Sequence, residues 1–525
     1  MRADRRGAHA PLAIVAAICY TIPKGFPQKG TITMKRFAAL FLTLTILLSL
    51  CACGAPAGEG GTTTTLAPTT TTEPPVPTPT VPALEAVSGT CTATLNDTLL
   101  SDYTLVYAAT ATDYTVRAVT YIRDEVFART GVVLPVVTDD VEIGARHEIV
   151  VGETNRPISA SFDALDAAIE GLEFGLVAQD GHVAMEADYF VIAAAAYYFV
   201  ATYVTGENTA VPATVQVCTP LVEEANNYIV LIGDGMGAVH TTMPARLEGA
   251  ALADYTDGEA IFYGDLLPYQ GFAHTNSLEN TTDSAAAATA LATGYKTTNG
   301  RIGRDKDGAD LLSITELAGS LGMATAVMST EVQSGATPGG FSAHADDRDD
   351  TEDILASQQV LQDKYGTVID GDHDVYTAYG VYQLEQRIAA HLHTLNANEK
   401  GFFMMYEEAH IDKHSHDVDV EGAARAVLRF NQAIATFMEF AFYHPDTFVL
   451  ITADHETGGL YVLGEKFKFN SGGHTGRDVP VYAYGVGAEV FDDQTIENVQ
   501  IPKTIVSLWG EALAPDTDDQ YPVLE

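Results

Sequence analysis

Carboxylate and imidazole side chains follow apolar, β-rich runs at several points of this sequence. The runs and the residues after them read NYIVLIGDGMG, GFFMMYEEAHIDKHSH and TFVLITADHETGG, and a further histidine lies in the glycine-rich NSGGHTGRD. Oxygen and nitrogen ligands without thiolates suit zinc, and an oxygen-rich subsite suits magnesium. We expect His410 and His414 to support this site or to lie on the surface. The candidate ligands are Asp234, Glu407, Asp412, His416, Asp454, His455 and His474.

Each of these clusters, taken alone, also has an ordinary structural explanation. A glycine-flanked Asp234 after a strand is typical of a turn. Asp412 and His416 at i,i+4 suit a pair on a helix surface, and a single His474 in a glycine loop suits a solvated side chain. These explanations do not account for acids and histidines that follow one core strand after another, so we favour a common site.

Ser284 begins the alanine run in ENTTDSAAAATALATG, which is a strong helix former. A helix N-cap is the ordinary explanation, because Ser, Thr and Asp accept hydrogen bonds from free helix N–H groups. A serine hydroxyl is a weak nucleophile unless its alkoxide is stabilised, and no histidine follows at a spacing that indicates a Ser–His–Asp triad. A zinc ion and the positive end of a helix could both stabilise it. Ser284 is therefore a candidate nucleophile as well as a candidate cap.

The segment EVQSGATPGGFSAHADDR adds two more candidates. Thr337 precedes Pro338 in a predicted loop and offers an oxygen ligand. Arg348 stands among four aspartates. It is either a surface residue in an acidic loop or a planar guanidinium that binds two phosphate oxygens.

The apolar runs that precede the clusters predict the fold. NYIVLIG, GMATAVMST, GFFMMY and DTFVLITA are typical of strands buried in a parallel sheet. A helix is predicted between the last two from Val427, Phe430, Ile434, Phe437 and Ala441. We therefore expect a doubly wound, mostly parallel α/β sheet with helices on both faces, in which ligands bind beyond the carboxyl ends of the strands.

A separate α/β domain is predicted before this sheet, at residues 86–222, and the sheet itself belongs to a domain at 226–525. The first domain contains a helix in YTVRAVTYIRDEVFARTG, short strands in LPVVTDD and HEIVVGETN, and a buried helix in YFVIAAAAYYFVATYVTG. It has no polar cluster that suggests catalysis, so we interpret it as an accessory module.

The N-terminal residues read as targeting sequence. Residues 1–33 are interpreted as a mis-called extension, and 34–52 as a signal with basic residues before an apolar stretch. Leu-Cys-Ala-Cys at its end resembles the bacterial lipoprotein processing box, with lipid on Cys53 and anchoring to the outer face of the cell membrane. An uncleaved N-terminal anchor is the alternative. Residues 53–85 form a Thr/Pro-rich linker. A disulfide between Cys91 and Cys218 stays open.

Charge limits the partners of the protein. The net charge of −42 at pH 7 argues against nucleic-acid binding, which requires a basic face. An anionic substrate would be repelled by the overall field and would need strong local positive charge. Bound metal is a ready source of such charge.

The segment from residue 226 to about 491 resembles the alkaline phosphatase family. It contains IGDGMG, TTDSAAAATALATGYKTTNG, ATPGGFSAHADDR, EEAHIDKHSH, TADHETGGL and HTG in the family order. The resemblance implies two zinc ions, a magnesium ion, a nucleophile at Ser284 and a phosphate-binding arginine at Arg348. It assigns one zinc ion to Asp412, His416 and His474, the second to Asp234, Asp454 and His455, and magnesium to Asp234, Thr337 and Glu407.

The implied function is the hydrolysis of small phosphate monoesters through a phosphoserine on Ser284. Alternatives are a phosphodiesterase or sulfatase of the same superfamily, or a lipoprotein that binds phosphate or metal without turnover. The sequence departs from the family at Gly335, where relatives have Asp or His, and we expect Ser334 or water to replace that side chain. Lys413 could reach phosphate through water. The segment from His455 to His474 is short, so the insertions that build dimer contacts in relatives are expected to be absent. Whether the protein forms a homodimer therefore stays open.

Overall fold

The computed structural model describes residues 80–81, 93–144, 146–162, 171–204, 210–246 and 261–513. All of these residues belong to one compact unit, Pro75–Glu525. The predicted extension 1–33, the signal 34–52, Cys53, Cys91 and the linker 53–85 apart from residues 80–81 lie outside the described residues. The disulfide between Cys91 and Cys218 therefore stays a prediction.

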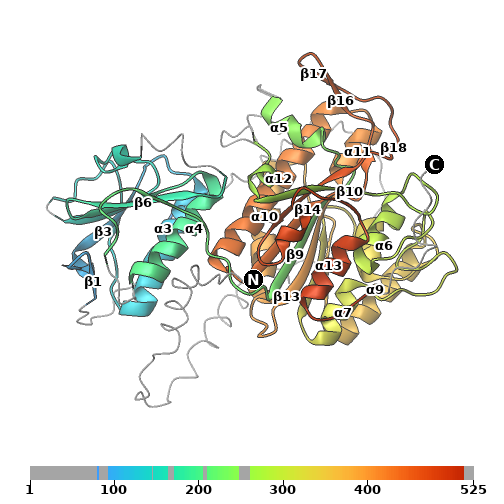
Figure 1. The fold of residues 1–525 in the computed structure, drawn as a ribbon, viewed down its shortest axis with the longest axis horizontal. Helices are drawn as coiled ribbons and strands as arrows, with labels where there is room; N and C mark the ends of the chain where they lie inside the picture. Colours follow the sequence, from blue (N-terminus) through green and yellow to red (C-terminus); the bar gives the residue numbers. More distant parts are fainter. Residues whose placement is uncertain are drawn as a thin grey trace, which may run out of the picture. The chain divides into compact units, whose positions relative to one another are not determined.

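An eight-stranded sheet forms the larger α/β region (Figure 1). Its strand order is β12-β11-β13-β9-β14-β19-β10-β20. The first five strands are parallel, and β19 runs antiparallel to β14 and β10. The strands are β9 (Asn227–Gly233), β10 (Tyr269–His274), β11 (Ala324–Ser329), β12 (Val368–Asp370), β13 (Phe402–Glu408), β14 (Thr447–Thr452), β19 (Val479–Tyr484) and β20 (Thr495–Glu497).

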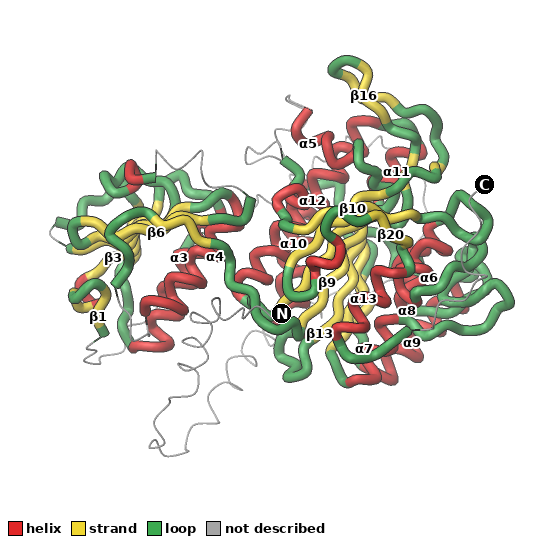
Figure 2. The backbone as a smooth tube through the Cα atoms, viewed as in Figure 1, coloured by secondary structure: helices red, strands yellow, loops and turns green. Residues whose placement is uncertain are grey.

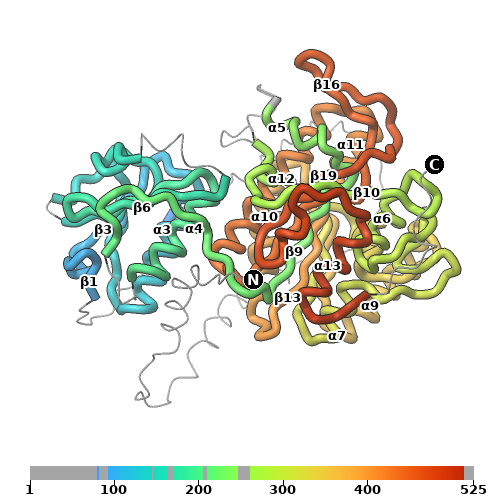
Figure 3. Tube along the Cα trace, viewed as in Figure 1, coloured from blue at the N-terminus to red at the C-terminus, as the bar shows by residue number. Residues whose placement is uncertain are grey.

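Helices lie on both faces of this sheet (Figure 2). One layer contains α10 and α12, and the other contains α6, α7, α8 and α9, with α13 packed against α6 (Figure 3). The predicted doubly wound, mostly parallel fold is confirmed. The helices are α5 (Met243–Arg246), α6 (Ser284–Thr293), α7 (Ile314–Leu321), α8 (Ala336–Ser342), α9 (Thr351–Tyr365), α10 (Ala378–Leu395), α11 (His410–His416), α12 (Val420–Tyr443) and α13 (Gln500–Leu508).

The central strands β9, β13 and β14 are buried along their whole length. Strands covered by helices on both faces read as continuous apolar runs, which is why the sequence predicts them well. Their carboxyl ends lie at the same edge of the sheet because the three strands are adjacent and parallel. Two small hairpins follow β14 in the chain. They pair β15 (Glu456–Thr457) with β18 (His474–Thr475), and β16 (Tyr461–Leu463) with β17 (Lys466–Lys468).

A second sheet of six strands, in the order β4-β3-β5-β7-β6-β8, forms the smaller α/β region. Among the described residues, this region also contains the short pair β1–β2. The Arg117 Nε of α3 lies 2.8 Å from Glu439 Oε1 of α12, which links this region to the larger one. Its elements are β1 (Thr94–Leu95), β2 (Thr98–Leu99), β3 (Tyr103–Tyr107), α3 (Asp113–Thr130), β4 (Val136–Thr138), β5 (His147–Val151), β6 (Phe174–Gln179), β7 (His182–Glu186), α4 (Ile192–Phe199) and β8 (Gln216–Cys218).

In the described parts of the chain, no helix combines the length and the apolar character that crossing a lipid bilayer requires.

Candidate active site

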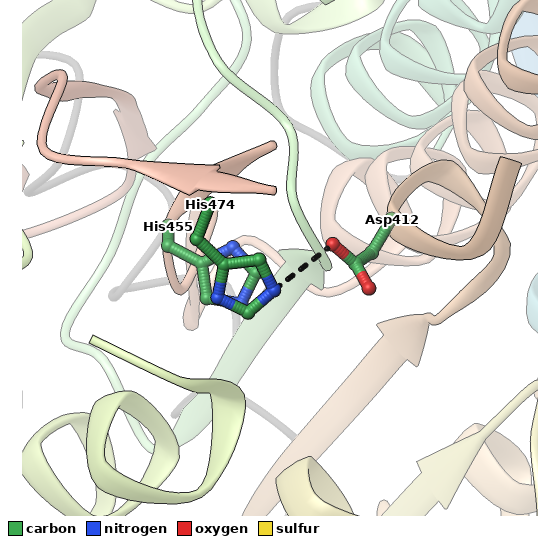
Figure 4. Close-up of side chains that lie close together, drawn as sticks. All are labelled: Asp412, His455 and His474. Atoms are coloured by element: carbon green, nitrogen blue, oxygen red, sulfur yellow. Dashed lines mark ion pairs between the residues drawn. The ribbon is translucent and has the colours of Figure 1, made fainter. Parts of the chain in front are cut away.

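Asp412, His416 and His474 come together at the carboxyl edge of the larger sheet. Asp412 and His416 lie one turn apart on α11, which begins directly after β13, and His474 is supplied by β18. His416 Nε2 lies 3.2 Å from Asp412 Oδ2. His474 Nε2 lies 3.6 Å from Asp412 Oδ1, and Figure 4 shows this pair as a dashed line. The His416 side chain is 41% exposed, so this group, the outer cluster, opens to solvent.

The two outer histidines face each other through their Nε2 atoms, which are 3.0 Å apart. His416 Nδ1 lies 2.6 Å from the Gly472 carbonyl, and His474 Nδ1 lies 2.9 Å from the Thr282 carbonyl. A carbonyl only accepts hydrogen bonds, so each Nδ1 carries a proton. Nε2 is then the nitrogen of each ring that faces Asp412, and it can bind a cation once it has lost its proton. This pattern is the one that metal-binding histidines adopt.

Asp234, Asp454 and His455 form a second group, the inner cluster. Asp234 follows β9, and Asp454 and His455 follow β14, so adjacent parallel strands place all three. His455 Nε2 lies 3.2 Å from Asp454 Oδ2 and 3.6 Å from Asp234 Oδ1, and the His455 side chain is fully buried. The ring of His455 stacks on that of His474 with centroids 3.7 Å apart, which brings the two clusters side by side (Figure 4).

Gly235 allows the two clusters to approach. Its φ is +72°, and a Cβ added there would lie 2.9 Å from the Asp412 Cα. Its N–H donates to Asp454 Oδ1 at 3.1 Å. Any other residue at this position would be strained and would push α11 away from β9.

Burial determines how the inner cluster holds charge. It raises the pKa of Asp454 to about 6 and the pKa of Asp234 well above its ordinary value, and it lowers the pKa of His455 to about 4. Burial would also raise the pKa of Asp412, but hydrogen bonds from His416 and Thr457 help to hold it well below the ordinary value. Buried carboxylates of this kind are costly unless a cation compensates them.

The donor set fits divalent cations. The inner cluster, and a second group of Asp412, His455 and His474, each bring carboxylate oxygens and imidazole nitrogens within 4.8 Å of one another. Within the part of the chain that the structure describes, Asp234 Oδ1 and Asp454 Oδ2 are buried and have no hydrogen-bond partner. Such oxygens are available as metal ligands, and the mixture of oxygen and nitrogen is the one that zinc takes in catalytic sites.

Ser284 lies beside both clusters. It is the first residue of α6, it is 3% exposed, and its Oγ lies 3.2 Å from His455 Nε2. The N-cap of α6 is Asp283, whose carboxylate accepts from the Ala286 N–H, so the alternative that Ser284 caps the helix is wrong. The Ser284 hydroxyl therefore points to the metal-binding groups without a capping task.

Arg348 reaches the same helix end from the loop after α8. Its Nη1 lies 3.2 Å from Asp283 Oδ2, and its backbone N–H donates to the Gly300 carbonyl at 2.8 Å. Burial would lower the pKa of the Arg348 guanidinium, but the charge and hydrogen bond of Asp283, together with the charges of Asp234 and Glu331, raise it. The acidic loop thus presents a fixed cation next to Ser284, although the residues around Arg348 are mostly aspartates.

Residues 225–378 and 369–470 match the family model described as alkaline phosphatase. This part of the chain is therefore similar to the alkaline phosphatase family. Alkaline phosphatase 3 of Bacillus subtilis is 27% identical over 424 residues, which cover 54% of this chain and 88% of the relative. Alkaline phosphatase 4 of the same organism is 30% identical over 300 residues, which cover 46% of this chain and 64% of the relative.

Two further comparisons give similar coverage. The streptomycin-6-phosphate phosphatase of Streptomyces griseus is 26% identical over 391 residues, covering 50% of this chain and 85% of that protein. The solved structure of alkaline phosphatase from the Antarctic bacterium TAB5 is 25% identical with a TM-score of 0.47, and covers 55% of this chain and 98% of that chain.

The third group of alkaline phosphatase residues expected from the sequence is Asp234, Thr337 and Glu407. Glu407 is the second-last residue of β13, Thr337 lies in α8 and not in the predicted loop, and both are fully buried. Of the described side-chain atoms, Glu407 Oε1 and Thr337 Oγ1 are among those buried without a hydrogen bond of good geometry. Burial, followed by the charge of Glu331, raises the pKa of Glu407 well above its ordinary value. This group is richer in oxygen than the other two, as a magnesium site requires.

The structure adds residues that sequence reasoning missed. The Thr457 hydroxyl donates to Asp412 Oδ1 and lies 3.2 Å from His455 Nδ1, so it connects the two clusters. Glu331 follows β11 and forms an ion pair with Lys413, 2.6 Å from Nζ to Oε2. The rule that ligands follow the carboxyl ends of strands could have found Glu331. His410 is buried beside Glu408, and His414 pairs with Asp419.

Proposed function

We propose that this chain is a metal-dependent phosphomonoesterase that forms a covalent phosphoserine on Ser284 and releases inorganic phosphate. The position of the Ser284 hydroxyl carries the proposal. It is buried at the N-terminus of α6, 3.2 Å from His455 Nε2 and beside two carboxylate–imidazole clusters. Because Asp283 caps the helix, the hydroxyl is free to act as a nucleophile. The positive end of α6 adds a favourable potential for a bound anion.

The unpartnered oxygens of Asp234, Asp454 and Glu407 support a role for metals, within the described part of the chain. When bound, divalent cations would supply positive charge to the attacking and leaving oxygens. They would also offset the repulsion that an anionic substrate meets in a chain of net charge −42. We assign zinc to the outer cluster, Asp412, His416 and His474, and to the inner cluster, Asp234, Asp454 and His455, and magnesium to Asp234, Thr337 and Glu407.

The residues of the chain have the following tasks in this proposal. Ser284 Oγ, having lost its proton to solvent, attacks phosphorus in line with the leaving oxygen. The bond from phosphorus to that oxygen breaks with its electron pair on the alcohol, which takes up a proton. Water then attacks the phosphoserine, phosphate leaves, and Ser284 recovers a proton. In both steps Arg348 binds two non-bridging oxygens through its planar guanidinium.

A panel of esters with one aryl leaving group tests the proposal. Purified protein, with its metal content measured, is assayed against the phosphate monoester, the phosphate diester and the sulfate ester. We expect the monoester to be hydrolysed fastest and phosphate to inhibit competitively. Preference for the diester or the sulfate would instead support the alternative enzymes of the superfamily. Phosphate binding without any turnover would support a binding lipoprotein.

We also propose that the mature protein is exported and anchored through a lipid on Cys53. The support comes from Lys35 and Arg36, the apolar stretch 37–50 and the box Leu-Cys-Ala-Cys. Mass spectrometry of the mature N-terminus tests this. An acylated Cys53 is expected, and an intact Met1 would contradict it. Cys53→Ala should move the protein out of the membrane fraction.

A further inference from the structure

The oxygen-rich group of Asp234, Thr337 and Glu407 is where the sequence departs from its family, because Gly335 has no side chain to offer. This inference concerns that group and rests on the proposed function. Two of its side chains, Thr337 and Glu407, are completely buried with an unpartnered oxygen, counted over the described residues. Buried oxygens of this kind are available to bind a cation, whichever residue occupies position 335.

Glu331 fills the space next to Gly335. A Cβ added at Gly335 would lie 2.1 Å from Glu331 Oε1 and 2.6 Å from its Cδ, so the Glu331 carboxylate lies where a side chain at 335 would begin. Gly335 has φ −59° and ψ 165°, a conformation open to other residues. The backbone therefore does not require glycine, and it is the Glu331 carboxylate that occupies the space of a side chain at 335.

Glu331 is held in this place from two sides. Its backbone N–H donates to Ser329 Oγ at 3.0 Å, and the Ser329 hydroxyl donates to the Glu407 carboxylate. Its carboxylate accepts from Lys413 Nζ at 2.6 Å. Burial would lower the pKa of the Lys413 ammonium, but the charge and hydrogen bond of Glu331, together with the charges of Glu407 and Asp234, raise it. The Glu331 side chain is 18% exposed, so it lies at the mouth of the group.

Charge in the group is left unbalanced by the chain itself. Asp234, Glu407 and Glu331 bring three carboxylates, and Lys413 brings one ammonium. The negative charge of Glu331 is the largest contribution after burial to the raised pKa of Glu407, and it adds to the raised pKa of Asp234 after burial and three other acids. A hard dication would offset the remaining charge, and magnesium keeps several waters when it binds few carboxylates.

We propose that Glu331, from the strand end before α8, replaces the side chain that Gly335 lacks and orients the water shell of a magnesium ion held by Asp234, Thr337 and Glu407. Lys413 positions its carboxylate. Glu331 is thus a positioning residue for the cation, supplied four positions earlier in the chain than in the family pattern.

Magnesium binding to the zinc-loaded protein tests this by titration calorimetry, with bound zinc counted in the same samples. Glu331→Gln keeps the shape of the side chain and removes its charge. We expect magnesium to bind about 10- to 100-fold more weakly, with zinc content and melting temperature unchanged. Glu352→Gln, an exposed acid on α9, is the matched control and should bind magnesium like the parent.

A swap gives a second readout. The Glu331→Ala substitution makes room for a side chain at position 335. The double variant Glu331→Ala, Gly335→Asp should therefore bind magnesium more tightly than Glu331→Ala alone. Parent-like magnesium affinity in Glu331→Gln, or no recovery in the swap, would overturn the inference. The titration measures cation binding and not turnover, so a failed phosphatase assay would reject the proposed function and leave this result standing.

Discussion

The Asp283 carboxylate holds the Arg348 guanidinium, with Oδ2 accepting from Nη1 at 3.2 Å. The same side chain caps α6 through Oδ1, which accepts from the Ala286 N–H at 2.9 Å. One aspartate therefore fixes both the helix that begins with Ser284 and the cation expected to bind phosphate. Asp283 thus helps to set the distance between Ser284 and Arg348, although Asp283 need not contact the substrate.

Asp283→Ala should affect stability and substrate binding together. Loss of the cap should cost about 1 kcal/mol of unfolding free energy. Loss of the partner of Arg348 should raise KM, because the guanidinium is no longer held. Urea unfolding and steady-state kinetics measure the two effects. Asp349→Ala is the control, because Asp349 is an exposed acid of the loop that contains Arg348. It should change neither the unfolding free energy nor KM.

Ser284→Ala should lower kcat by on the order of 10³-fold or more, because the proposed covalent step has no nucleophile left. Metal content and melting temperature should stay at parent values, since Asp283 and not Ser284 caps the helix. Quenched reactions with labelled substrate should show phosphoprotein in the parent only. Retained turnover in this variant would exclude the phosphoserine mechanism.

Arg348→Ala should weaken phosphate inhibition by about 10- to 100-fold, as expected for the loss of charged hydrogen bonds worth about 1.5–3 kcal/mol. Arg348→Lys should lie between, because an ammonium keeps the charge but not the planar fork. The inhibition constant for inorganic phosphate measures the effect. Equal inhibition of all three proteins would remove Arg348 from the site.

Removing metal with a chelator should abolish activity and lower the melting temperature. Without cations, the inner carboxylates Asp234 and Asp454 stay buried close together, which is unfavourable. A ligand at a thousandfold excess over its Kd stabilises the folded state by about 4 kcal/mol. Zinc should restore both properties, whereas magnesium alone should not restore activity. Calorimetric scans with metal analysis check this, and a chelator-treated protein with full activity would contradict it.

Arg429→Met should destabilise the protein by about 3–5 kcal/mol, because it leaves the buried Glu408 charge unpaired. Arg429 Nε lies 2.7 Å from Glu408 Oε2, and both side chains are buried. Combining Arg429→Met with Glu408→Gln should recover part of the loss. Denaturant unfolding of the three variants tests this pair, which joins the end of β13 to α12.

The same pair sets a pH dependence. Burial would raise the pKa of Glu408, but Arg429, together with His410, lowers it from 4.5 to about 2. A depressed folded-state pKa means that the unfolded chain binds more protons between these values. The contribution of the pair is therefore present above pH 4.5 and is lost as the pH falls toward 2. Acid unfolding of the Arg429→Met, Glu408→Gln variant should lack this component.

The part of the site that could be predicted from the sequence is the part whose ligands directly follow strands of the sheet. Apolar runs identify β9, β13 and β14, and the parallel-sheet rule then places Asp234, Asp412 and Asp454 at one edge. The sequence did not reveal β10 and β19, whose residues do not form one uninterrupted apolar, β-branched run. The sequence also did not show which side chains contact each other across loops. Neither the contact of Asp283 with Arg348 nor that of Glu331 with Gly335 follows from spacing, because loop geometry creates both.

The difference in exposure between His416 and His455 has a kinetic consequence. The first side chain is 41% exposed and the second is fully enclosed. A chelator in solution can therefore reach the imidazole of His416 much sooner than that of His455. We therefore expect metal to be lost in two stages. An ion at the outer cluster should exchange quickly, and an ion at the inner cluster should leave only when the carboxyl edge of the sheet opens.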